Sequence, residues 1–125
     1  MKKEDKELLL KDLCSRIMYG VKCTVYEDTS VYTLSGVLSD NVHNELYFKE
    51  LDWKECDGFA DAQYCKPYLF PISSMTDEQK EDMIKSSVGI GSDKNVFDWY
   101  NKNHFDYRGL IPMSLAIDAT GLNIY

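Results

Sequence analysis

The spacing of the apolar side chains changes near residue 20, and this change constrains the fold more than any other feature of the sequence. Before it, apolar residues recur every three or four positions, which predicts an amphipathic helix over residues 4–18. Gly20 follows as a natural helix stop. The expected apolar face of this helix consists of Leu9, Leu10, Leu13, Cys14, Ile17 and Met18.

From residue 21 the apolar side chains alternate with polar ones, which is the pattern of half-buried strands. Strands are predicted over residues 21–26, 31–38 and 46–51, and the polar segments between them predict turns. Gly36 indicates a bulge or a bend in the second strand. Three successive strands with short connections predict an antiparallel meander on which the first helix docks.

The second half of the chain predicts two further helices. Residues 52–64 fit either a fourth strand or a helical turn, and residues 66–71 are expected to be extended around their prolines. Thr76 and Gln79 form a capping-box pattern that opens one helix, and an aromatic-rich helix is expected over residues 94–102. The glycines between these helices lack the spacing of a phosphate-binding loop.

These elements define the expected fold class. We predict one α+β domain over residues 1–125, with a small antiparallel sheet of three to four strands, an N-terminal helix and two C-terminal helices. Residues 113–119 are expected to add a short final strand or a docked tail.

The charge balance and the cysteine spacing exclude several function classes. The formal net charge of −7 repels phosphate backbones, and no basic patch offsets it, so nucleic-acid binding is not expected. No apolar run approaches the roughly 20 residues that span a bilayer, and acidic residues interrupt the N-terminal basic segment, so we expect a cytoplasmic protein with no membrane partner. Eight residues separate Cys14 from Cys23, and eight separate Cys56 from Cys65, which is too far for paired zinc ligands. Reduced thiols, no metal and no cofactor are therefore expected.

A chain with nine tyrosines offers candidate binding residues. Tyrosine buries a large area on binding at little cost in rotamer entropy. Tyr64, Tyr68 and Phe70, beside two prolines, form the first candidate surface. The alternative is that these side chains cover the sheet or belong to the core.

A second candidate cluster contains His104, Asp106, Tyr107 and Arg108. In a small hydrolase-like enzyme, His104 would act as the base, Asp106 would orient it, and Arg108 would hold an anion. The alternative is structural: Asp106 caps a turn or pairs with Arg108, and His104 closes a helix at its C-terminal end, where the dipole favours a cation.

Three segments carry a resemblance to a known group of proteins. They are residues 13–23, 66–76 (Lys-Pro-Tyr-Leu-Phe-Pro-Ile-Ser-Ser-Met-Thr) and 98–111 (Asp-Trp-Tyr-Asn-Lys-Asn-His-Phe-Asp-Tyr-Arg-Gly-Leu-Ile). Together they resemble a family of short uncharacterised proteins from gut anaerobic bacteria and their phages or mobile elements. The resemblance implies a bacterial or phage origin but no activity. Phe70 departs from the family pattern, which favours arginine at that position.

Three hypotheses for the function remain open from the sequence. The first is a non-enzymatic protein-interaction or accessory module that binds a protein partner or associates with itself. The second is an acidic, phage-type inhibitor or nucleic-acid mimic that binds a basic host protein, which the charge of −7 suggests. The third is the small hydrolase-like enzyme centred on His104, Asp106 and Arg108.

Overall fold

The computed structural model describes residues 1–26, 28–39, 44–50, 59–89 and 92–125. Its α-helices are α1 (Lys3–Arg16), α2 (Asp77–Ser86) and α3 (Ser92–Lys102). Its short 3₁₀ helices are η1 (Ile17–Tyr19), η2 (Ala62–Tyr64) and η3 (Ile72–Ser74). Its strands are β1 (Lys22–Val25), β2 (Asp28–Ser39), β3 (Asn44–Phe48), β4 (Phe59–Asp61), β5 (Cys65–Pro71), β6 (Phe105–Asp106) and β7 (Ile117–Asp118).

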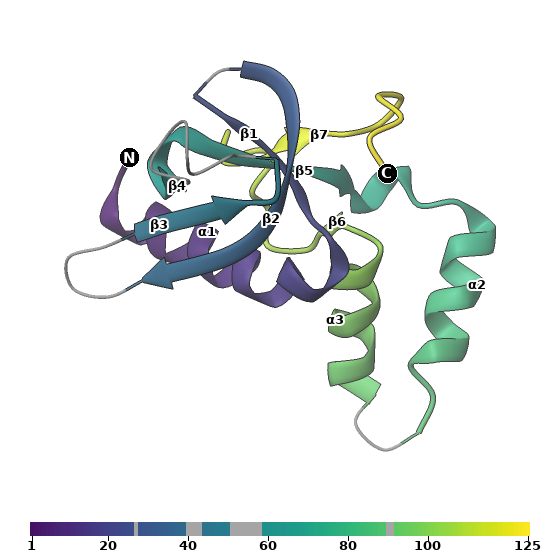
Figure 1. Ribbon diagram of the computed structural model, residues 1–125. Helices are drawn as coiled ribbons and strands as arrows, with labels where there is room; N and C mark the ends of the chain where they lie inside the picture. Colours follow the sequence, from purple (N-terminus) through teal and green to yellow (C-terminus); the bar gives the residue numbers. More distant parts are fainter. Residues whose placement is uncertain (27, 40–43, 51–58, 90–91) are drawn as a thin grey trace.

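Within the described residues, seven strands form one mixed sheet with the order β4-β3-β2-β1-β5-β6, in which β7 also pairs with β5 (Figure 1). From β4 through β3, β2 and β1 to β5, each strand is antiparallel to the next. The short strands β6 and β7 pair with β5 in parallel. The pairing of β2 with β3 shifts its register between Leu34 and Gly36, so the bulge predicted at Gly36 is confirmed.

Helix α1 packs against the sheet and closes the main core. Leu9 and Leu13 are fully buried in a cluster that every long strand joins. The strand residues that line this cluster include Cys23, Leu34, Leu46, Phe48, Cys65 and Leu69, and Val21 joins it just before β1. Gly20 has a positive φ of 67°, which a glycine adopts without strain, and it turns the chain from η1 into β1 as predicted.

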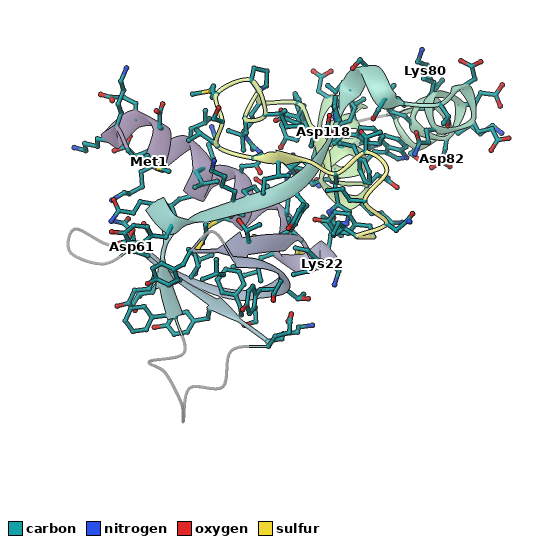
Figure 2. The ribbon with its side chains drawn as sticks, turned by 90° about the horizontal axis from the view of Figure 1, so that it is seen from above. Met1, Lys22, Asp61, Lys80, Asp82 and Asp118 are labelled. Carbon is teal, nitrogen blue, oxygen red and sulfur yellow. The ribbon has the colours of Figure 1, made fainter. Side chains whose placement is uncertain are left out.

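Helices α2 and α3 form a hairpin that projects from the sheet (Figure 1). Seen from above, Lys80 and Asp82 on α2 lie at the opposite end of the molecule from Met1 and Asp61 (Figure 2). The capping box predicted at Thr76 and Gln79 is present, with both reciprocal hydrogen bonds formed. Helix α2 has no buried residue. The indole Nε1–H of Trp99 donates to Asp82 at 2.8 Å and ties α2 to α3.

The α+β class is confirmed, whereas the predicted strand count was too low. Among the residues that the structure describes, the sheet has seven strands rather than three or four, and its parallel pairings are additional to the expected meander. Strands β4, β6 and β7 span only two or three residues, so they show no periodicity in the sequence. Residues 52–64, for which the sequence fitted either a strand or a helical turn, contain both β4 and η2. The first part of this segment, up to residue 58, lies outside the described residues.

The predicted apolar face of the first helix was partly wrong. Cys14 is exposed, and the side chain of Met18 is 82 % exposed. The α-helix ends at Arg16, and the tighter 3₁₀ turn that follows changes the angle between successive side chains, so Met18 leaves the buried face. The buried face instead includes Asp12 and Arg16, two charged residues.

Candidate functional site

The structure separates the three aromatic residues of the first candidate surface. Tyr68 is buried, so it belongs to the sheet and not to an exposed surface. Phe70 is half-buried between the rings of Phe105 and Tyr125, each with its centroid 5.9 Å away. Tyr64 alone remains open, with half of its area exposed. Tyr68 and Phe70 are covered because β5 is a central strand, on which most side chains are buried or half-buried.

Tyr64 stacks on a residue that the sequence did not single out. Its ring centroid lies 5.0 Å from that of Tyr26, at an interplanar angle of 26°. The Tyr26 backbone N–H also donates to the carbonyl of Tyr64 at 2.9 Å, which fixes the two residues side by side. Tyr26 has a φ of 54°, a left-handed conformation that is costly for a bulky side chain.

His104 lies inside the protein at the point where α3 leads into β6. Its side chain is 8 % exposed and stacks on the ring of Tyr125, with centroids 3.7 Å apart. Its Nδ1 has no hydrogen-bond partner among the described residues. Burial, followed by the positive charges of Arg16 and Lys22, lowers the pKa of His104 to about 4. The imidazole is therefore neutral at pH 7, so it does not act as the helix-closing cation expected above.

Asp106 closes a turn. Its two carboxylate oxygens accept hydrogen bonds from the backbone N–H groups of Leu110 and Ile111, each at 2.9 Å. The turn-capping interpretation of this residue is thus the one that the contacts bear out, although Arg108 is not its partner. Arg108 instead donates to Asp12 at 2.7 Å and to Ser15 at 3.1 Å. His104, Asp106 and Arg108 each have separate contacts and do not form one hydrogen-bonded arrangement, so the geometry does not favour the hydrolase hypothesis.

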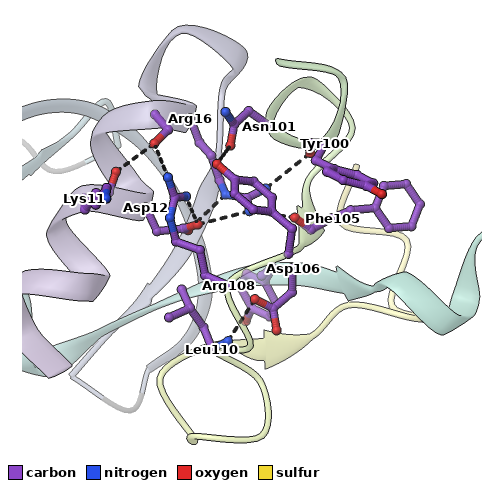
Figure 3. A network of polar contacts seen from close by, with 12 residues as sticks. Lys11, Asp12, Arg16, Tyr100, Asn101, Phe105, Asp106, Arg108 and Leu110 are labelled. Carbon is purple, nitrogen blue, oxygen red and sulfur yellow. Dashed lines mark hydrogen bonds and ion pairs between the residues drawn. The ribbon is translucent and has the colours of Figure 1, made fainter. Parts of the chain in front are cut away.

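The polar centre of the molecule is a pair of buried charges on α1. Asp12 and Arg16 occupy positions i and i+4, and both side chains are completely buried. Arg16 binds the carboxylate through two nitrogens: Nε donates to one oxygen at 2.9 Å, and Nη2 donates to the other at 3.1 Å. Such a charge-assisted, two-point contact is the strong form of an arginine–carboxylate pair. Arg108 adds the third member of this network (Figure 3).

Arg16 also joins α1 to the C-terminal part of the chain. Its Nη2 donates to the carbonyl of Phe105 at 2.6 Å, and its Nη1 reaches the carbonyl of Tyr100 at 3.4 Å. These bonds satisfy a backbone acceptor of β6 and one near the C-terminal end of α3. A charged group is stable here because several hydrogen bonds and a carboxylate replace its hydration shell.

The ring of Tyr107 lies between the two arginines of the network. The guanidinium carbon of Arg108 is 4.5 Å from its centroid, and that of Arg16 is 5.4 Å away. Cations at these distances interact favourably with the face of an aromatic ring. The Tyr107 hydroxyl donates to Oδ1 of Asn101 at 3.0 Å, which holds the ring in position.

A depression of about 510 Å³ opens next to this network, between α1, α3 and the segment after β6. A second depression, of about 330 Å³, lies between α2 and α3, and its lining includes the acids Asp82 and Asp98 and the amides Asn95 and Asn103. The first contains two of the predicted site residues, Tyr107 and Arg108; the second contains none. The first depression is lined by Lys11, Ser15, Phe97, Asn101, Tyr107 and Arg108.

Asp12, Arg16 and Tyr26 were not predicted as site residues from the sequence. The signal for the first two was present, because an acid and an arginine at positions i and i+4 lie beside the apolar stripe of Leu9 and Leu13 on the helix. Nothing in the sequence pairs Tyr26 with Tyr64, since their contact depends on the pairing of β1 with β5. In the part of the chain that the structure describes, no group of three His, Cys, Asp or Glu side chains is arranged to hold a metal ion.

Comparison with family models, with curated proteins and with solved structures finds no match to this chain. Across the described ranges, no helix has both the length and the apolar character that crossing a membrane requires.

Proposed function

We propose that the protein is a non-enzymatic protein-interaction module. The observation that carries the proposal is the stacked pair of Tyr26 and Tyr64, whose side chains remain 58 % and 50 % exposed. By contrast, Asp106 and Arg108, which were candidates for catalysis, are engaged in internal contacts. Asp106 and Arg108 therefore stabilise the fold, whereas the pair of Tyr26 and Tyr64 faces outward.

The aromatic pair has the properties of a contact surface for a protein. Each tyrosine adds a large apolar area with only two side-chain torsions to fix, so binding costs little entropy. Stacking and the backbone hydrogen bond between the two residues pre-organise the pair before any partner arrives. The fold also keeps Tyr26 at a costly positive φ, which orients its ring toward that of Tyr64.

The partner proposed is a protein with an apolar patch and basic residues around it. The apolar patch suits the tyrosine rings, and the basic residues suit a chain with a formal net charge of −7. The acidic-inhibitor hypothesis is a special case in which the charge dominates the binding. It predicts an affinity that falls steeply with added salt, whereas an aromatic contact predicts a weak salt dependence.

The test is site-specific crosslinking in the cells from which the protein comes. A photo-crosslinking residue at position 64 is expected to give one discrete product, and Tyr26→Ser in the same chain is expected to remove it. A crosslinker at Ile84, which is 60 % exposed but lies on α2, serves as the matched control. A product of twice the chain mass would identify self-association. A monomeric protein with no product at position 64 would contradict the proposal.

A further inference from the structure

The depression between α1 and α3 combines positive charge with an aromatic wall, and nothing in the preceding sections assigns it a ligand. Neither Tyr26 nor Tyr64 lines this depression. Whether it binds a ligand is therefore independent of the proposed protein contact.

Positive charge exceeds negative charge around this depression. Asp12 is the carboxylate shared by Arg16 and Arg108, so one negative charge faces two guanidinium groups. Lys11, which is exposed on the same helix, adds a further cation to the lining. The chain as a whole is strongly acidic, which makes a local excess of cations unusual and favours an anionic ligand at this point.

The polar side chains that line the depression carry hydrogen-bond donors. A guanidinium has five N–H groups, and Arg108 uses one toward Asp12 and one toward Ser15 within the described part of the chain. The side-chain oxygen of Asn101 accepts from Tyr107, and its amide nitrogen is directed away from that bond (Figure 3). The Arg108 guanidinium cannot turn freely, because these two bonds and the Tyr107 ring 4.5 Å away hold it.

The apolar side of the depression is formed by two rings. Phe97 is half exposed, and its centroid lies 5.1 Å from that of Tyr107. An aromatic ring or another flat apolar group that enters the depression would contact Phe97 while its charged end meets Arg108 and Lys11. Donors on one side and a ring on the other are the usual composition of a small-ligand site.

We propose that this depression binds a carboxylate carried on an aromatic or similarly apolar body. The planar carboxylate matches the fork of N–H donors that arginine presents. Two sources offer this chemistry: the C-terminal residue of a peptide and a free aromatic acid. In both cases Arg108 and Lys11 bind the charge, and Phe97 contacts the apolar body.

The experiment is a titration of the ¹⁵N-labelled protein, followed by NMR, with three probes. Phenylacetate represents the free acid, N-acetyl-Ala-Ala-Phe represents a peptide terminus, and N-acetyl-Ala-Ala-Phe amide is the neutral control. We expect saturable shifts of the Ser15, Phe97 and Asn101 amides with one or both acids, and a much weaker response to the amide. The acid that binds more tightly identifies the source.

Two variants keep the test independent of folding. The backbone carbonyl of Lys11 accepts a hydrogen bond from Ser15, but its side chain forms no hydrogen bond or ion pair with the described residues, so Lys11→Gln is expected to fold normally and to raise the Kd of the acids about two- to fivefold. Lys66→Gln removes the same charge from an exposed position on β5 and is expected to leave the Kd unchanged. Phe97→Ser is expected to weaken both acids. Equal binding of acid and amide, equal effects of the two lysine variants, or no saturable shift would overturn the proposal.

Discussion

Arg108 lies with its Nη1 atom 2.7 Å from Oδ1 of Asp12, so a residue near the end of the chain completes the charge balance of the first helix. The Asp12 side chain is completely buried, whereas that of Arg108 is 15 % exposed. One end of this contact is therefore structural and the other reaches the surface beside the proposed carboxylate site.

Replacement of Asp12 by alanine is expected to be strongly destabilising. It would leave Arg16 buried without its counter-charge, and breaking a buried ion pair in this way costs about 3–5 kcal/mol of the free energy of unfolding. Urea unfolding followed by circular dichroism measures the change. Asp98→Ala, which removes an exposed partner of Lys94, is the control and is expected to have little effect. A similar stability for both variants would contradict the structural role of Asp12.

The stability of the protein is expected to fall between pH 6.5 and pH 4 because of His104. Burial and nearby cations lower the pKa of this group to about 4 in the folded state, whereas the unfolded chain takes up its proton near pH 6.5. Below pH 6.5 the unfolded state therefore binds more protons, and the free energy of unfolding decreases by about 2–3 kcal/mol as the pH falls to 4. Above pH 6.5 this contribution is complete and constant.

The variant His104→Asn isolates that contribution. Asparagine accepts the positive φ of 62° at this position better than most residues, and it does not titrate. The free energy of unfolding of both proteins is measured from pH 7.5 to pH 4, and the difference between the two curves removes the effects of all carboxylates. A difference that does not change with pH would show that His104 is not protonated on unfolding.

Loss of the capping box is expected to loosen α2 without unfolding the rest. Thr76→Ala removes the hydroxyl that accepts from the Gln79 backbone N–H, which costs about 1 kcal/mol. Because α2 buries no residue, the loss is expected to appear as faster hydrogen exchange of α2 amides, while the sheet amides keep their protection. Ser73→Ala, an exposed change just before the helix, is the control. Equal exchange in both variants would show that the cap does not hold the helix.

The thiols of Cys23 and Cys65 are expected to be unreactive in the folded protein. Burial, and then the neighbouring Cys65, raises the pKa of Cys23 well above its usual value, while burial and Asp61 raise the pKa of Cys65 to about 12. Because only the thiolate reacts, labelling at pH 8 is limited by unfolding.

The thiol measurement uses a chain with Cys14 and Cys56 replaced by serine. Cys14 is exposed and Cys56 lies outside the described residues, so both are removed to leave the two buried thiols. Ellman's reagent is expected to react slowly in buffer and at once in denaturant. Immediate reaction of both thiols under native conditions would contradict their burial.

Local signals in the sequence predicted local features well. Gly20 marked the turn after the first helix, Gly36 marked the bulge, and Thr76 with Gln79 marked the start of α2. In each case the backbone conformation or hydrogen bond that the residue indicates is formed within four residues of it. The same holds for the alternation that indicated β1, β2 and β3.

Features that depend on distant contacts were not predictable in this way. Prolines usually argue against a central strand, yet β5 contains Pro67 and Pro71 and lies between β1 and the two parallel strands. Arg16 is charged, and its burial depends on the distant carbonyl groups of Tyr100 and Phe105 as well as on Asp12. Arg108 was correctly singled out, but its partner is 96 residues away, so sequence proximity to His104 and Asp106 was misleading.

The bonds of Arg16 have a consequence for how the chain folds. The acceptor at Phe105 is 89 residues distant, so α1 cannot acquire its complete set of partners until the last third of the chain has reached the sheet. Closing so long a loop costs conformational entropy before any hydrogen bond forms to offset that cost. Proteins rich in such long-range contacts fold more slowly than those with mainly local ones. The N-terminal helix and the segment around β6 therefore belong to one cooperative folding unit, although they are almost as far apart in the chain as two elements can be.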